Sequence, residues 1–306
     1  MRFRARTSGS AFLPAHQFVQ GDAVGAGSGA GAPTAVVLHG LCGSARNMVS
    51  FARRLVKAHP RWQCVLVDLR AHGRSASAPP ASGDAVRVAA TEVLLLLSHL
   101  RLFPSCVVGH SLGGKACLSM LEQFAQRLPR PVQFFVLDSC PGPLNLSGAS
   151  APSGSSSDTD PRHLIHCLES IQPLPHSKRE LEHSLRKFNL SVNVASWLSS
   201  TARETKHSSL ELGLDVDGVK ALLDSYERAD LWPVVEDPPE GSFIDFIIAD
   251  SSLGTRWTSH DSARASSARA RVHNVANASH WLHIEQPEAV LDCMHDALQP
   301  EVAAPS

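Results

Sequence analysis

The sequence has no excess of either charge and no long apolar run. Its 306 residues have a formal net charge of −1 at pH 7, and lysine and arginine form no clustered run. A chain without a basic field has no electrostatic means of holding a phosphate backbone, so we expect no nucleic-acid partner. The longest unbroken apolar stretch is "VLLLL" at residues 93–97, whereas a bilayer span needs roughly 20 such residues. We therefore expect no integral membrane association.

The sequence also lacks paired cysteine motifs and metal-ligand motifs. No CxxC and no HExxH occurs, and His163, His166 and Cys167 are better explained as one helix face than as a zinc site. We expect no metal and no organic cofactor, and reduced, mostly buried thiols in a reducing, intracellular compartment. We expect this compartment to be the cytoplasm or an organelle (mitochondrion or plastid). The organellar alternative is suggested by residues 1–10, which are rich in Arg and Ser and free of acidic side chains. The cysteines are Cys42, Cys64, Cys106, Cys117, Cys140, Cys167 and Cys293.

Short apolar segments alternate with amphipathic segments along the first half of the chain. "TAVVLHG", "WQCVLVDLR" and "CVVGHS" are each followed by a helical pattern. Strands that are apolar at every position are typical of a parallel sheet covered on both faces. The sequence therefore predicts an α/β fold with a mostly parallel, doubly wound sheet. The hydrophobic content of 43% is enough for one sizeable core.

This alternation stops after the apolar segment at 132–138. Residues 147–160 have the Ser- and Gly-rich composition of a flexible linker. Four helix-like segments without intervening strands then predict a helical cap at 161–232, inserted into one α/β core. The core is expected at 11–146 and again at 233–299, where strand and helix patterns resume.

One motif suggests a nucleophile. Gly109 to Gly113 reads G-H-S-L-G, which matches the G-x-S-x-G turn that carries a nucleophilic serine between a strand and a helix. An apolar strand precedes the motif, and apolar residues recur every four positions after it. Ser111 is therefore expected in a strained turn at a helix N-terminus, with the glycines providing space. The alternative is an ordinary Gly-rich turn between a strand and a helix.

A serine hydroxyl needs a base and an acid that orients the base. His280 follows the last apolar strand and precedes the last helix, where the chain order Ser, acid, His would put the base. His283 is the nearest rival, but it enters the helical run. Two acids stand at strand ends, Asp138 in "FVLDSCPG" and Asp250 in "FIIADSSLG". We favour Asp138 as the acid and keep Asp250 as the alternative.

An oxyanion needs hydrogen-bond donors that are in place before charge develops. The backbone N–H groups of Leu41, in the loop "LHGLCGS", and of Leu112, directly after the serine, are the expected pair. A cap over this edge of the sheet predicts an apolar-walled substrate pocket. The candidates for substrate binding are the neighbouring residues His39, Gly40, His110 and Trp281, of which His39 and His110 could also be packing residues.

Five segments in fixed order together resemble the serine hydrolase and esterase group of the α/β-hydrolase superfamily. They are "VVLHGLCGSARN", "VDLRAHGRSA", "VVGHSLGGKA", "FVLDSCPG" and "ANASHWLHIEQPE", and the resemblance covers roughly residues 11–298. It implies the α/β-hydrolase fold with a helical cap, and it places the catalytic acid at Asp138 with Ser252 as a possible fourth member. The chain departs from the family in having Ser279 instead of Gly immediately before His280.

Two hypotheses follow. In the first, the chain is a serine esterase that cleaves a small-molecule acyl ester through an acyl-enzyme on Ser111, with thioesters and lipid acyl esters as further candidate substrates. Serine at this position, instead of aspartate, argues against dehalogenase and epoxide-hydrolase chemistry. In the second, the fold serves as a catalytically weak or inactive ligand receptor, which the departures at Ser279 and around Ser252 favour. The sequence gives no indication of the oligomeric state.

Overall fold

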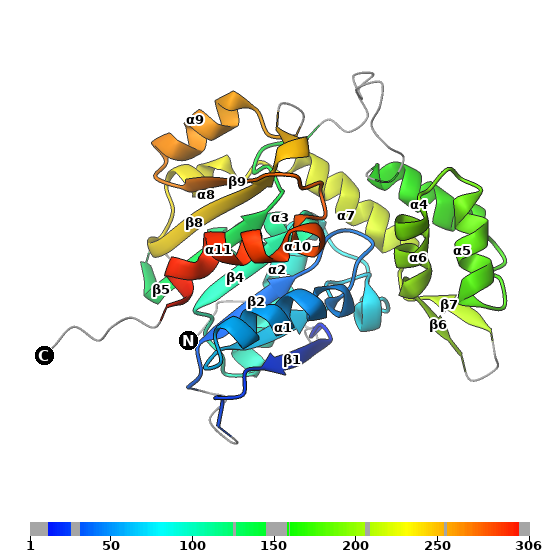
Figure 1. Cartoon of the computed structure of the whole chain (residues 1–306), viewed down its shortest axis with the longest axis horizontal. Coiled ribbons are helices and arrows are strands. Elements are labelled where there is room, and N and C mark those ends of the chain that lie inside the picture. The colour runs from blue at the N-terminus through cyan, green and yellow to red at the C-terminus, as the bar shows by residue number, and fades with distance from the viewer. Residues whose placement is uncertain are drawn as a thin grey trace, which may run out of the picture.

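The fold is built around a seven-stranded sheet (Figure 1). The strand order is β1-β3-β2-β4-β5-β8-β9, and every neighbouring pair is parallel except β1 with β3. This confirms the predicted α/β class with a mostly parallel sheet. The computed structural model describes residues 12–25, 31–124, 127–144, 158, 160–205, 209–253 and 256–299.

The strands β2, β3 and β4 are buried at every residue. Their apolar runs were interpreted as strands covered on both faces, and successive residues of each strand do point to opposite sides. Val36 of β2 belongs to one hydrophobic core and Val37 to the other. The strands are β1 (His16–Gln20), β2 (Thr34–Leu38), β3 (Gln63–Val67), β4 (Cys106–His110), β5 (Arg127–Leu137), β8 (Glu240–Ala249) and β9 (Arg271–Val275).

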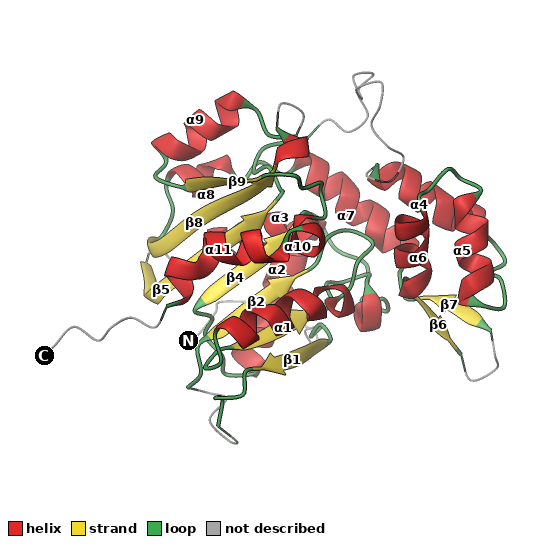
Figure 2. Cartoon of the chain, viewed as in Figure 1, coloured by secondary structure: helices red, strands yellow, loops and turns green. Residues whose placement is uncertain are grey.

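Helices cover both faces of the sheet (Figure 2). Helices α1, α10 and α11 pack on the face that carries Val37, whereas α2, α3, α8 and α9 pack on the face that carries Val36. Three short 3₁₀ turns complete this core: η1 (Ala45–Met48), η2 (Gly73–Ser75) and η4 (Asp250–Ser252). The helices are α1 (Val49–Ala58), α2 (Ala85–His99), α3 (Leu112–Glu122), α8 (Trp232–Glu236), α9 (Ser259–Ser267), α10 (Leu282–Glu285) and α11 (Pro287–Leu298).

The chain between β5 and α8 forms a separate group of elements, which we call the cap. Figure 1 shows α4, α5, α6 and the β6–β7 hairpin to one side of the sheet, with α7 leading back toward it. The expectation of a strand-free insertion was wrong, because β6 and β7 pair antiparallel. Strands of three residues are too short to show an alternating pattern. The cap elements are α4 (Pro161–Ser170), α5 (Lys178–Arg186), α6 (Val192–Thr201), β6 (Ala202–Glu204), β7 (Leu210–Leu212) and α7 (Val216–Arg228).

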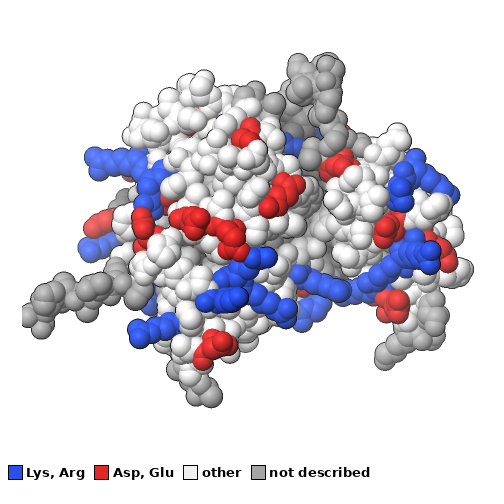
Figure 3. Space-filling model, viewed as in Figure 1, with Lys and Arg blue, Asp and Glu red and all other residues white. Residues whose placement is uncertain are grey.

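Further sequence-based expectations concern the linker, the N-terminal segment, the cysteines and membrane association. The predicted linker at 147–160 lies outside the described residues except for Asp158 and Asp160, as does the N-terminal segment 1–10. All seven cysteines are described; none forms a disulfide, and six are buried. Over the described ranges, no helix combines the length and apolar character needed to cross a bilayer. Figure 3 shows side chains of both charges sharing the visible face.

Candidate active site

Ser111 lies in a strained turn between β4 and α3. Its backbone has φ 53° and ψ −114°, a region that residues other than glycine rarely adopt. The Ser111 N–H donates to the Leu137 carbonyl of β5 at 3.0 Å, which ties the turn to the neighbouring strand. The side chain is thereby held at the carboxyl edge of the sheet, at the N-terminus of α3. Such strain is typical of functional sites.

The two glycines of the motif are required by close backbone packing. A Cβ on Gly109 would lie 2.1 Å from the Gly113 carbonyl oxygen, and a Cβ on Gly113 would lie 2.4 Å from the Leu38 carbonyl oxygen. Any side chain at either position would push the start of α3 away from β2 and β4. The glycines therefore let α3 begin directly above the sheet, as the motif predicted.

Asp138 immediately follows β5, and its backbone is also strained, with φ 47°. Its carboxylate accepts three hydrogen bonds: from His280 Nδ1 at 2.6 Å, from Ser252 Oγ at 2.8 Å and from the Ala249 N–H at 3.0 Å. Burial acts to raise the pKa of Asp138, but these bonds outweigh it and hold the pKa below its ordinary value. The group is therefore an ionised, buried hydrogen-bond acceptor.

His280 lies in the turn between β9 and α10. Because the ionised Asp138 carboxylate can only accept, Nδ1 of His280 carries the proton and Nε2 is left with a free lone pair. Burial lowers the pKa of His280, and the positive charge of Arg256 adds to this, although the bond to Asp138 acts in the opposite direction. A neutral imidazole with a bare Nε2 is the form that can accept a proton from a serine hydroxyl.

His283 and Asp250, the alternative base and the alternative acid, make other contacts. His283 is buried on α10, and its ring stacks on His110 at 4.4 Å between centroids. Asp250 accepts from the N–H groups of Asn277 and Ala278, at 2.8 and 3.1 Å, so its carboxylate holds the turn that leads to His280. The structure therefore brings Asp138, and not Asp250, to the His280 ring.

Ser279, the departure from the family pattern, has its own partner. Its N–H and Oγ both donate to the carboxylate of Glu285, at 2.6 and 2.7 Å. The added side chain closes the turn before α10. It does not interfere with the bond between His280 and Asp138.

Two buried histidines, His39 and His72, hold the loop after β2 in place through hydrogen bonds. His39 Nδ1 lies 2.8 Å from the Gly40 carbonyl oxygen, and its Nε2 accepts from the Leu69 N–H at 3.0 Å. His72 Nε2 accepts from the Cys42 N–H at 3.0 Å, and burial lowers the pKa of His72 to about 3. Neutral histidines thus shape the loop that carries Leu41.

Leu41 and Leu112, the residues expected to supply the oxyanion donors, are near Ser111 in the cavity lining and in sequence, respectively. Leu41 lines the same cavity as Ser111. Leu112 is the first residue of α3, and the first N–H groups of a helix have no acceptor within the helix. Gly40 is needed for this approach, because a Cβ there would lie 2.8 Å from His110 Nδ1. His110 in turn donates from Nε2 to the His280 carbonyl at 2.7 Å.

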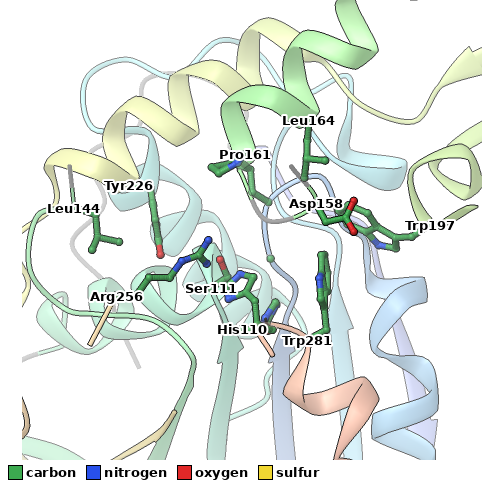
Figure 4. A pocket seen from close by; sticks show the side chains of 13 residues that line it. His110, Ser111, Leu144, Asp158, Pro161, Leu164, Trp197, Tyr226, Arg256 and Trp281 are labelled. Carbon is green, nitrogen blue, oxygen red and sulfur yellow. Dashed lines mark hydrogen bonds between the residues drawn. The ribbon is translucent and has the colours of Figure 1, made fainter. Parts of the chain in front are cut away.

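A cavity opens above Ser111, between the sheet edge and the cap (Figure 4). The part of the chain that the structure describes leaves about 50 Å³ there. Sites for drug-sized ligands usually hold about 300 to 1,000 Å³, so the space that the described residues leave is small by comparison. One wall is aromatic, with the rings of Trp197 and Trp281 4.7 Å apart. The lining residues are Gly40, Leu41, His110, Ser111, Leu144, Asp158, Pro161, Leu164, Trp197, Tyr226, Arg256, His280 and Trp281.

The cavity differs from the sequence-based expectation in two respects. His39 was expected to contact substrate, but it is 1% exposed and does not line the cavity, because both its ring nitrogens hold the neighbouring loops. Sequence reasoning also missed Tyr226, Arg256 and Trp197, which come from the cap and from the loop after η4. None of these three lies in a motif, so no local signal identified them.

The chain is similar to known proteins over most of its length. A profile of the Alpha/beta hydrolase family matches residues 35–292. The chain is 27% identical to sn-1-specific diacylglycerol lipase ABHD11 of Mus musculus, over 86% of this chain and 80% of that protein. It is 25% identical to Esterase YbfF of Escherichia coli (strain K12), over 84% and 89%. A solved marine microorganism esterase has a TM-score of 0.71 at 20% identity, over 92% and 98% of the two chains.

Proposed function

The chain belongs to the alpha/beta hydrolase family and is a carboxylic ester hydrolase, and we propose that it cleaves its substrate through an acyl-enzyme on Ser111. His280 takes the Ser111 proton as the oxygen attacks the ester carbonyl, and then gives that proton to the departing alkoxide. Asp138 holds the imidazole and stabilises its charged form. A water molecule, activated by the same histidine, releases the acid and restores the serine.

One observation carries this proposal: the buried, ionised Asp138 binds His280 Nδ1 at 2.6 Å, and the same His280 lines the cavity that contains Ser111. Three residues from distant parts of the chain thus meet at the carboxyl edge of the sheet. Their chain order of Ser, acid, His is the one expected for this fold. Ser252, whose Oγ donates to Asp138, is a positioning residue for the acid.

The backbone N–H groups of Leu41 and Leu112 would stabilise the oxyanion. Donors fixed in the protein need no reorganisation when charge develops, which makes them more effective than water. The loop of Leu41 is held by His39 and His72, and Leu112 is held by the start of α3. Both donors are therefore set by rigid parts of the core.

We propose an acyl ester with an apolar acyl group as the substrate class. The cavity wall contributed by the cap includes Leu164 and Trp197, and Leu144 and Trp281 add further apolar surface. The relatives named as sn-1-specific diacylglycerol lipases are consistent with a lipid acyl ester, and thioesters remain within the same chemistry. Gly40, His110 and Trp281 are proposed to contact the substrate beside the reacting carbon.

The test is hydrolysis of p-nitrophenyl esters of increasing chain length by wild type and S111A. Removing the nucleophile of a serine hydrolase can cost about 10⁶ in kcat, so we expect no turnover above background. S251A removes an exposed serine from η4 and is the matched control, which should keep full activity. A fluorophosphonate probe should label wild type, with the mass increase on the peptide containing Ser111. Unchanged hydrolysis by S111A would refute Ser111 as the nucleophile, and tight ligand binding without labelling would support the receptor hypothesis.

A further inference from the structure

The mechanism above gives no role to the buried charge of Lys115. Lys115, on α3 one turn after Ser111, is fully buried, yet no carboxylate bonds to its ammonium group. Instead, Nζ donates to three backbone carbonyls: Gly142 at 2.7 Å, Tyr226 at 2.6 Å and Ala229 at 2.9 Å. Burial lowers the pKa of Lys115 to about 8. A buried cation is costly unless its donors are satisfied, so this site is built to hold an ammonium group.

The three carbonyls show what Lys115 holds. Gly142 follows β5 and Asp138, whereas Tyr226 and Ala229 lie at the C-terminal end of cap helix α7. That helix end presents unpaired carbonyls and a partial negative charge, which a cation satisfies. Lys115 therefore fastens the last turn of α7 to the helix that begins at the nucleophile.

Of the residues that Lys115 holds, Tyr226 faces the reaction site. Tyr226 is the only tyrosine in the chain. Its ring lies under Lys115 Nζ, 4.7 Å from the centroid, and its side chain lines the cavity. Figure 4 shows it pointing from α7 toward Ser111 and Arg256. Ser111 lines the same cavity as this side chain.

We propose that Tyr226 is a further catalytic residue, whose hydroxyl donates a hydrogen bond to the leaving-group oxygen of the ester, and that Lys115 is the positioning residue that holds it there. This inference rests on the proposed acyl-enzyme at Ser111. The two oxyanion donors are backbone groups of the core, so the cap side of the Ser111 oxygen remains for the departing alcohol. A phenol on that side can stabilise the negative charge that develops as the ester C–O bond breaks.

The protonation state of the tyrosine fits this role. Burial raises the pKa of Tyr226, and the neighbouring hydroxyls and Arg256 only partly oppose this. The phenol therefore stays protonated, and remains a donor, around neutral pH, where His280 is already neutral. It adds no charge of its own to the site. The proton that leaves with the alcohol still comes from His280.

The first test is Y226F, which removes one oxygen atom and keeps the ring under Lys115. Loss of a single preorganised donor to a developing negative charge costs roughly 10² to 10³ in kcat, and we expect the lower end for alkyl esters with unchanged KM. p-Nitrophenyl esters, whose leaving group needs little stabilisation, should lose much less. Full activity of Y226F on alkyl esters, or an equal loss on both ester types, would overturn the proposal.

The single tyrosine permits a direct spectroscopic test on the intact enzyme. Incorporated 3-fluorotyrosine gives one ¹⁹F resonance, which reports only residue 226. Reaction with diethyl p-nitrophenyl phosphate places a phosphoryl group on the nucleophile, and we expect the resonance to shift in wild type and to stay in place in S111A. No shift on stoichiometric phosphorylation of wild type would contradict contact with the reacting group.

The role of Lys115 is tested by a double-mutant cycle. In K115M, the Tyr226 and Ala229 carbonyls at the end of α7 lose their bonds to Lys115, while Ser225 keeps its bonds to Asp84 and Val86. If Lys115 positions the tyrosine, Y226F should lower alkyl-ester kcat by less than threefold in that background. If K115M does not fold, K115Q, which keeps an amide donor, takes its place. An undiminished effect of Y226F in the variant would show that Lys115 only stabilises the fold. The proposed function fails if S111A retains activity or if the probe does not label wild type, whereas a fully active Y226F with an inactive S111A rejects this inference alone.

Discussion

Replacement of Asp138 by Asn tests the site most sharply, because it changes one atom in the densest part of its hydrogen-bond network. In the wild type the carboxylate accepts from His280, Ser252 and the Ala249 N–H. The Asn oxygen can still accept from Ala249, and the hydroxyl of Ser252 can turn to accept from the amide. His280 Nδ1, however, then faces an NH₂ group. It must become the acceptor, and the proton moves to Nε2.

This change of tautomer determines how much kcat falls in D138N. With its proton on Nε2, His280 cannot accept the proton of Ser111, although the position of the ring is preserved. The same substitution in a well-studied Ser-His-Asp protease lowers kcat about 10⁴-fold, which corresponds to about 5.4 kcal/mol at 1.36 kcal/mol per tenfold. We expect a loss of that size in kcat for D138N, with a small change in KM, because no proposed substrate contact is removed.

The assay is steady-state hydrolysis of p-nitrophenyl butyrate, together with the rate of labelling by a fluorophosphonate. D250N is the matched control: it removes a charge from the neighbouring strand end, where Asp250 binds the N–H groups of Asn277 and Ala278. We expect D250N to lower the melting temperature and to keep kcat within about tenfold, since one or two hydrogen bonds are weakened. A larger loss of kcat in D250N than in D138N would refute the assignment of the acid.

Two further predictions concern the partners of this pair. S252A removes one of three bonds to Asp138 and should lower kcat by about tenfold, since a hydrogen bond to a charged group contributes about 1.5 to 3 kcal/mol; a loss as large as that of D138N would make Ser252 more than a positioning residue. R256Q removes a positive charge that lowers the pKa of His280, so this pKa should rise. Because His280 must be neutral to act as a base, the acid limb of the kcat/KM profile should move to higher pH, whereas R264Q, at an exposed ion pair on α9, should leave it in place.

The sequence predicted those features that depend on local physics. Strands such as Thr34–Leu38 are apolar at every position because they are buried on both faces, and that pattern is visible in the letters. Ser111 was found for a similar reason: only glycine fits at 109 and 113, where a side chain would strike backbone atoms. Asp138 and His280 were expected because the ends of parallel strands meet at one edge of the sheet.

The features that escaped prediction depend on contacts between distant segments. His72 shapes the loop of Leu41 through one bond to Cys42, thirty positions away. Arg256 follows a 3₁₀ turn and enters the cavity from a loop with no motif. The β6–β7 hairpin has three residues in each strand, too few for an alternating pattern. In each case the position follows from tertiary packing, to which single-sequence patterns are insensitive.

The core and the cap contribute to the site in different ways. Ser111 and Asp138 are fixed by strand ends and by glycine contacts. The loop of Leu41 is held by His72, which forms a β-bridge with Leu214 of the cap. Tyr226, Leu164 and Trp197 belong to the cap, and of these Tyr226 is tied to the core through Lys115. Lys115 thereby couples Tyr226, a residue of the cap, to the helix that begins at the nucleophile, so a change at Lys115 should reach the reaction site through this one side chain.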